Sequence, residues 1–250
     1  MAPKLRITSA AWEFWTDRHV RSGFFVATGD LIRAIWGFLR ESTPSRLRSR
    51  FGDADYDWDY RVNTTSGAVG WRDRLLGIFH SSYQPTEREL FHEMIHALEQ
   101  QENFNFTDFT FVDLGSGKGR TLLMASDYPF RRIVGVELLP ALHAIAIENL
   151  AHYHNESQKC FACESICADA TRFPLPEGSL VIYLFNPFPE AGLLRAMANL
   201  DESIQKNPRP TYVLYHNPEF EQVMTARGPR TRKMAGTHQY SIFTIETGKS

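Results

Sequence analysis

Glycines and an acid follow a short apolar stretch near the middle of the chain. Residues 109–114 read FTFVDL, which is typical of a buried strand, and the next five residues read GSGKG. A glycine-rich turn between a strand and a helix lets backbone N–H groups and the helix N-terminus approach a ligand. The segment therefore predicts a ligand-binding loop.

Two common phosphate-binding patterns do not fit this loop. In a dinucleotide fingerprint the third small residue would be Arg120 or Leu122, depending on the frame. A P-loop needs a glycine and a hydroxyl residue at the positions that Val112 and Gly119 occupy. What remains is the pattern G-x-G-x-G, with Asp113 at the end of the preceding strand.

Acidic residues also end the next two apolar stretches. Glu137 follows Asp113 by 24 residues, and Asp169 comes after the third stretch. A carboxylate at the position of Glu137 can accept hydrogen bonds from both hydroxyls of a ribose, whereas it would repel a phosphorylated ribose. The alternative for both residues is a solvated side chain at a strand end. The spacing after a glycine loop favours ribose binding for Glu137.

The fourth apolar stretch ends in Asn186-Pro187-Phe188. Asn-Pro is good turn chemistry, so a plain strand-to-loop turn is one interpretation. The other depends on a resemblance, because residues 83–246 resemble class I S-adenosylmethionine-dependent methyltransferases in the order and spacing of these motifs. Asn-Pro-Phe is similar to a shortened [N/D]-P-P-[Y/F] motif of amino-group methyltransferases. It is also similar to the Asn-Asn-Phe stretch of the seven-strand histone lysine methyltransferases.

The string YQPT at residues 83–86, ahead of FVDLGSGKGR, resembles an uncharacterised bacterial group of such enzymes. The single proline of the fourth motif, where the nucleic-acid enzymes have two, argues against base methylation. The resemblance implies S-adenosyl-L-methionine as the cofactor and S-adenosyl-L-homocysteine as the product. The residues that it implies for cofactor binding are Tyr83, Thr86, Asp113, Gly115, Ser116, Gly117, Gly119, Glu137, Asp169, Ala170 and Asn186.

The resemblance also implies catalytic roles for Asn186, which would hold a target nitrogen beside the methyl group, and for Phe188, which would pack on the substrate. The expected reaction is direct in-line transfer to an amino acceptor on a protein or small molecule. Tyr183 and Tyr215 are expected to shape the acceptor pocket. His216 is interpreted as a wall residue, with a general base as the alternative. The alternative function is a non-catalytic S-adenosylmethionine-binding or interaction domain that retains only the cofactor loop.

The elements that must position these residues alternate between strand and helix. This alternation predicts an α/β fold with a doubly wound, mostly parallel sheet and helices on both faces, and the resemblance implies seven strands. We expect strands at 109–114, 133–137, 164–168, 179–185 and 211–215, and an antiparallel edge strand at 238–246. We expect helices at 86–100, 118–128, 140–153, 189–205 and 218–226, the first started by a capping box of Thr86 and Glu89.

Residues 1–82 are expected to form a helical and loop extension to a methyltransferase domain of residues 83–250. An amphipathic helix is expected from Asp30, as its N-cap, to Glu41. We expect its apolar stripe to pack on the main domain, and the alternative is docking on a partner or a membrane surface. Residues 51–70 are expected to be a loop that either lines a substrate mouth or caps the edge of the core.

The composition is that of a folded domain. The chain has 250 residues, 43% of them hydrophobic, and a net charge of −2, which excludes disorder and provides no strong signal for nucleic acid. No apolar run has the length of a membrane span, and Glu13 and Asp17 argue against a signal peptide. Three cysteines, an odd number, favour a reducing cytoplasm over disulfides. Their C-x2-C-x3-C spacing reverses that of radical S-adenosylmethionine enzymes, and we expect no metal.

Overall fold

The computed structural model describes residues 11–12, 14–16, 19–20, 23–41, 54–65, 85–101, 104–228 and 230–246. Tyr83, one of the expected cofactor residues, lies outside these ranges. The expected domain boundary after residue 82 lies outside them as well, together with residues 51–53 and 66–70 of the expected loop.

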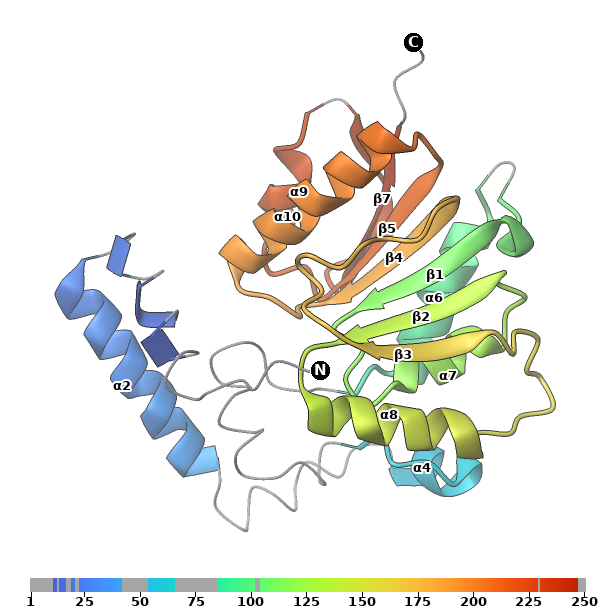
Figure 1. Cartoon of the computed structure of the whole chain (residues 1–250), viewed down its shortest axis with the longest axis horizontal. Coiled ribbons are helices and arrows are strands. Elements are labelled where there is room, and N and C mark those ends of the chain that lie inside the picture. Colours follow the sequence, from blue (N-terminus) through green and yellow to red (C-terminus); the bar gives the residue numbers. More distant parts are fainter. Residues whose placement is uncertain are drawn as a thin grey trace.

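A seven-stranded sheet forms the centre of the molecule (Figure 1). It lies in the order β3-β2-β1-β4-β5-β7-β6, in which β1 to β5 are parallel and β7 is antiparallel to both neighbours. This is the doubly wound, mostly parallel fold expected of a class I methyltransferase, so the predicted fold class is confirmed. The strands are β1 (Phe109–Leu114), β2 (Arg132–Glu137), β3 (Cys163–Cys167), β4 (Ser179–Phe185), β5 (Thr211–His216), β6 (Thr231–Gly236) and β7 (Tyr240–Ile245).

One strand has no counterpart among the expected ones. The sequence of β6, TRKMAG, lacks the alternation of a half-buried strand, and its side chains are exposed or half-buried. The strand forms because the backbone of β7 pairs with it across a hairpin, with a register shift between Lys233 and Ala235. The late strand predicted at the sheet edge therefore lies second from that edge.

Helices cover both faces of the sheet, as Figure 1 shows. One core contains Phe91, Leu122 and Phe111, and the other contains Val112 and Leu193. Because side chains alternate along a strand, the neighbours Phe111 and Val112 enter opposite cores. The helices of the first face are α6 (Arg88–Glu99), α7 (Arg120–Ser126) and α8 (Pro140–His152), and those of the second are α9 (Glu190–Lys206) and α10 (Glu221–Thr225). A 3-10 turn, η2 (Phe106–Asp108), leads into β1.

The capping box predicted for α6 is wrong. The helix begins at Arg88, and its N-cap residue Glu87 makes no side-chain capping hydrogen bond. Thr86, one residue farther back, instead shares a hydrogen bond of 3.2 Å with the buried Tyr183 hydroxyl. The Thr86 hydroxyl therefore bonds to a side chain of the sheet and does not form the α6 cap that the local pattern predicts.

The expectation for the N-terminal helix is wrong in two respects. α2 (Phe24–Glu41) begins before Asp30, whose carboxylate accepts a hydrogen bond of 2.8 Å from Arg33 Nη1 inside the helix. Its apolar stripe is not buried on the main domain, because Phe25 and Trp36 are exposed. In Figure 1 the helix stands to one side of the sheet and its covering helices.

Part of the expected loop at residues 51–70 is helical. α4 (Ala54–Tyr60) places Tyr56 in the core, with its ring centroid 4.8 Å from that of Tyr60. Tyr60 in turn lies 5.3 Å from the ring of Tyr153, at the end of α8. Of the two alternatives for this segment, the described part caps the edge of the core.

Gly135 in β2 has no room for a side chain, since an added Cβ would lie 2.6 Å from both Leu122 Cδ1 and Ser116 Oγ. We expect Gly135→Ala to lower the free energy of unfolding by about 1–3 kcal/mol, because overpacking forces neighbouring side chains out of their rotamers. Denaturant unfolding measures the change. Gly29→Ala in α2 is the matched control, because nothing lies within 4 Å of its added Cβ. An equal loss in both variants would contradict this packing argument.

Candidate functional site

The glycine loop between β1 and α7 has a backbone that few other residues adopt. Gly115, Gly117 and Gly119 have φ angles of 100°, 54° and 81°. A Cβ on Gly115 would lie 2.4 Å from Pro187 Cβ, and one on Gly119 would lie 3.1 Å from Ala146 Cβ. The loop is therefore in contact with α8 on one side and with the Asn-Pro-Phe turn on the other, which brings together two motifs far apart in the sequence.

Glu137 is buried at the end of β2 and holds this loop. Its Oε2 accepts a hydrogen bond of 2.8 Å from the Gly117 N–H, and its Oε1 accepts one of 2.8 Å from the Leu139 N–H. Burial raises the pKa of the carboxyl group, and these backbone N–H groups oppose the shift. A carboxylate oxygen can accept more than one hydrogen bond, so both oxygens of Glu137 keep capacity for an external hydroxyl.

Asp113 is the penultimate residue of β1 and is buried. Burial raises its pKa to about 7, a hydrogen bond with Thr121 opposes the shift, and the charge of Glu137 adds to it. The charge of Glu137 therefore adds to burial in favouring the neutral form of Asp113.

Asp169 and Ala170 follow the end of β3, which pairs with β2 as far as Glu137 and Cys167. Ala170 is buried in the second core. Asp169 is exposed, and its Oδ1 accepts hydrogen bonds of 2.9 and 2.7 Å from the backbone N–H and hydroxyl of Thr171. Asp169 and Glu137 thus both lie at the carboxyl ends of their strands. The side chain of Asp169 is held in a local turn by its hydrogen bonds to Thr171.

Asn186 has a left-handed backbone, with φ of 41°, directly after β4. Such a conformation is uncommon outside glycine, and asparagine tolerates it better than most residues. Among the described residues its buried Oδ1 has no hydrogen-bond partner, and neither has the buried Oγ of Ser116 in the glycine loop. Buried polar atoms are nearly always paired, so these two atoms at one edge of the sheet point to a ligand that supplies the partners. Phe188 is half-buried and packs against α9 at Gly192.

A chain of hydrogen bonds crosses the sheet beside this turn. Thr86 Oγ1 lies 3.2 Å from the Tyr183 hydroxyl, which lies 2.7 Å from Nδ1 of His216. The His216 ring stacks on Phe185 at 3.9 Å, and burial lowers its pKa to about 4. The imidazole is therefore neutral and hydrogen-bonded near neutral pH, as a wall residue would be.

The expected contribution of two tyrosines to an acceptor pocket is wrong, because Tyr183 and Tyr215 are each only 1% exposed. Tyr183 lies in the first core, where its ring meets Phe91 edge-on at 5.8 Å. The Tyr215 hydroxyl accepts a hydrogen bond of 3.3 Å from the Phe220 N–H. Their position on interior strands explains the burial, since both faces of this sheet are covered.

Sequence reasoning missed the anchor that joins residues 54–65 to the glycine loop. Lys118 Nζ donates hydrogen bonds to Asn63 Oδ1, at 3.0 Å, and to the carbonyl oxygen of Thr65. Asn149 of α8 donates to the carbonyl oxygens of Asn63 and Lys118, and its Oδ1 accepts from the Asn63 N–H at 2.8 Å. Burial lowers the pKa of Lys118 to about 8, and the Asp57 charge opposes the shift. A lysine between two glycines was the one available signal, and it is compatible with many other roles.

The described residues contain no group of three or more potential ligands that could hold a metal ion. Cys160, Cys163 and Cys167 are free thiols, and Cys163 Sγ lies 3.4 Å from the Cys160 carbonyl oxygen. Within the described part of the chain, no helix has the length and apolar character needed to cross a membrane.

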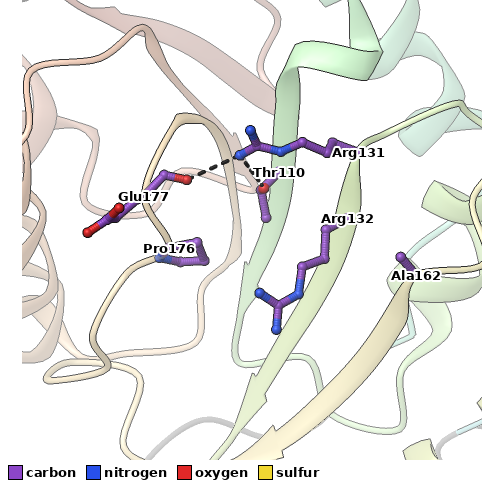
Figure 2. Close-up of a pocket in the computed structure, with 6 residues that line it drawn as sticks. All are labelled: Thr110, Arg131, Arg132, Ala162, Pro176 and Glu177. Atoms are coloured by element: carbon purple, nitrogen blue, oxygen red, sulfur yellow. Dashed lines mark hydrogen bonds between the residues drawn. The ribbon is translucent and has the colours of Figure 1, made fainter.

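A pocket of about 500 Å³ opens at the opposite, amino-terminal ends of the strands (Figure 2). Arg131 reaches across it and donates hydrogen bonds to Thr110 Oγ1, at 3.2 Å, and to the Glu177 carbonyl oxygen, at 3.1 Å. The residues that line the pocket are Thr110, Arg131, Arg132, Ala162, Pro176 and Glu177. Ligands of parallel α/β sheets bind at the carboxyl ends of the strands, so this pocket is not part of the candidate site.

No family model and no curated protein matches the chain. Among solved structures it is similar to an RNA methyltransferase from Salinibacter ruber in complex with S-adenosyl-L-homocysteine, with 18% identity, 67% of this chain and 97% of that chain covered, and a TM-score of 0.46. It is similar to a human methyltransferase 10 domain containing protein, with 9% identity, coverage of 82% and 98%, and a TM-score of 0.48. A ribosomal protein L11 methylase from Lactobacillus delbrueckii subsp. bulgaricus has 13% identity, coverage of 64% and 79%, and a TM-score of 0.44. Likenesses this distant do not decide what this chain binds.

The buried imidazole of His216 should make the folding stability depend on pH. With its pKa lowered from 6.5 to about 4, the unfolded chain binds a proton between these values that the folded protein does not. The contribution of His216 to stability is present above pH 6.5 and is lost as the pH falls towards 4, by up to about 1.4 kcal/mol per pH unit. His216→Gln should remove this part of the slope in denaturation measured across that range. An NMR titration of His216 with a midpoint near 6.5 in the folded protein would contradict the prediction.

Proposed function

We propose that this protein is an S-adenosylmethionine-dependent methyltransferase that moves a methyl group by direct in-line transfer to an amino acceptor. One observation carries the proposal: Gly115 of the glycine loop packs against Pro187, which follows Asn186. A cofactor held by the loop would therefore have the unpaired oxygen of Asn186 beside it. In the proposal the glycine loop binds the cofactor and the side chain of Asn186 orients the acceptor.

Glu137 and the glycine loop support the cofactor assignment. The carboxylate is held in place by two backbone N–H groups and keeps capacity for the two ribose hydroxyls. When bound, S-adenosylmethionine supplies a methyl group that its sulfonium makes electrophilic. In the proposal Asp169 and Ala170 hold the adenine. The other proposed cofactor residues are Tyr83, Thr86, Asp113, Gly115, Ser116, Gly117, Gly119 and Asn186.

Asn186 and Phe188 are the proposed acceptor residues. A buried carboxamide oxygen without a partner can accept a hydrogen bond from an amine N–H and leave the nitrogen lone pair directed at the methyl group. Alignment of this kind supplies a large part of the rate in a two-substrate transfer. Phe188 packs on the substrate in the proposal. The resemblance to lysine methyltransferases and to one bacterial group stays a prediction.

The proposal retains the division into residues 1–82 and a methyltransferase domain of residues 83–250, and a cytoplasmic location. The anchor of residues 54–65 on Lys118 and Asn149 supports packing of this part of the extension against the domain. Free cysteines support a reducing compartment.

Calorimetry with Glu137→Ala tests the cofactor. Wild type should bind S-adenosylmethionine without added metal and should not bind NAD. The variant should bind about 1.5–3 kcal/mol more weakly, the range for hydrogen bonds to a charged group. Glu164→Ala is the matched control, because Glu164 lies on β3 in an ion pair with Arg132 and should leave binding unchanged. Thermal unfolding verifies that each variant folds. Tight NAD binding without S-adenosylmethionine binding, or an unchanged Kd in folded Glu137→Ala, would contradict the assignment.

Transfer of a tritiated methyl group into fractionated cell extract tests the reaction and identifies the acceptor class. Asn186→Gly keeps the left-handed backbone and removes the side chain, so it should bind cofactor nearly as tightly as wild type and lose transfer by about a hundredfold or more. Asn186→Asp should retain part of the activity, because its carboxylate accepts the same hydrogen bond.

Asn217→Gly is the control for this experiment, since Asn217 has a φ of 48° after the neighbouring strand β5 and has no part in the proposal. It should transfer methyl groups as wild type does. Label in protein, nucleic acid or small molecules assigns the acceptor. Cofactor binding without label in any fraction would favour the non-catalytic domain, and full activity of Asn186→Gly would show that Asn-Pro-Phe is only a turn.

A further inference from the structure

α2 exposes a continuous apolar face. Phe25 is 89% exposed, Trp36 69% and Ile32 61%. Phe24 and Ile35 are exposed beside them. At 100° per residue these five side chains fall within about 120° of the helix circumference, so they form one stripe. A helix that belonged to the core of this domain would have buried such a stripe.

A preceding aromatic residue packs on the N-terminal end of this stripe. Ala27 is fully buried, and Trp15 Nε1 donates a hydrogen bond of 3.2 Å to Thr28 Oγ1. The Trp15 ring also meets Phe24 edge-on at 5.7 Å and stacks on His19 at 4.7 Å. Thr28 lies about 40° from Phe24 around the helix, so Trp15 covers part of the stripe at its N-terminal end. Phe25, Ile32 and Trp36 stay exposed.

The charge of the surrounding sequence indicates the partner. Residues 1–50 hold nine Lys/Arg and four Asp/Glu, a net charge of +5, whereas the whole chain carries −2. Arg33, on the helix itself, forms an ion pair with Asp30 at 2.8 Å and has an 81% exposed side chain. A second copy of the chain has the same net positive charge in residues 1–50, which would oppose pairing of the two segments. An anionic lipid surface has the opposite charge and an apolar interior.

We propose that α2 docks this protein on an anionic lipid surface, with its axis in the plane of the interface. In this arrangement Phe25, Ile32 and Trp36 enter the boundary between headgroups and acyl chains. Tryptophan suits this depth, because its ring is apolar and its N–H is polar. The net positive charge of residues 1–50 attracts the anionic headgroups. The helix lies on the surface and does not cross it.

The test is sedimentation of the full-length protein with phosphatidylcholine vesicles, with and without phosphatidylserine. Wild type should bind the phosphatidylserine vesicles about tenfold or more tightly than the neutral ones, and added salt should weaken binding. Trp36→Asp should reduce binding to the phosphatidylserine vesicles by about tenfold or more, because a carboxylate at the centre of the stripe opposes insertion and is repelled by the lipid.

Phe161→Asp is the matched control, because Phe161 is an aromatic side chain of the sheet domain with 77% exposure. It should bind vesicles as wild type does. Calorimetry with S-adenosylmethionine and thermal unfolding, run on each variant, report the domain separately from α2. Equal affinity for both kinds of vesicle, no binding to either, or an equal loss in Phe161→Asp would overturn the proposal. So would a wild-type dimer in light scattering that Trp36→Asp dissociates without vesicle binding, since a second copy would then be the occupant.

Discussion

The hydrogen bond from the Gly117 N–H to the buried Glu137 carboxylate is the contact on which the candidate site depends. A carboxylate inside a protein is costly unless donors satisfy it, and here the backbone of the loop and of Leu139 supplies them. The same bond holds the glycine loop against the end of β2 in its left-handed conformation. With the loop in this position, Gly115 meets Pro187, and the Asn-Pro-Phe turn lies beside it.

A second set of contacts joins the glycine loop to residues 54–65, which precede the methyltransferase-like region in the chain. Lys118 lies between two of the glycines, and its ammonium group is satisfied by Asn63 and Thr65, while Asn149 joins both segments to α8. A buried lysine needs such partners because it loses its hydration. Residues 54–65 are therefore part of the structure that shapes the loop, although they precede the region that resembles methyltransferases.

Two sets of polar groups lie at the carboxyl ends of the strands, one hydrogen-bonded within the protein and one without partners among the described residues. Thr86, Tyr183 and His216 bond to one another in the interior, which stabilises a neutral imidazole in an apolar wall. Asn186 Oδ1 and Ser116 Oγ, by contrast, are buried without a partner among the described residues. Burial of an unpaired polar atom lowers stability, so its presence beside a glycine loop is the feature of the structure that most directly suggests a ligand.

The sequence by itself determined the α/β fold and six of the seven described strands, β1 to β5 as short apolar runs and β7 by its alternation. The sequence also predicted the glycine loop and the acid at the end of β2, because both predictions depend only on residues close together in the chain. Only the tertiary structure decided the partner of Thr86, the existence of β6 and the outward stripe of α2. The first two depend on a distant partner, the Tyr183 hydroxyl in place of a helix cap and the backbone of β7. The third depends on Phe25, Ile32 and Trp36 staying exposed in the described part of the chain. Local sequence patterns contain no information about which distant group a residue will contact.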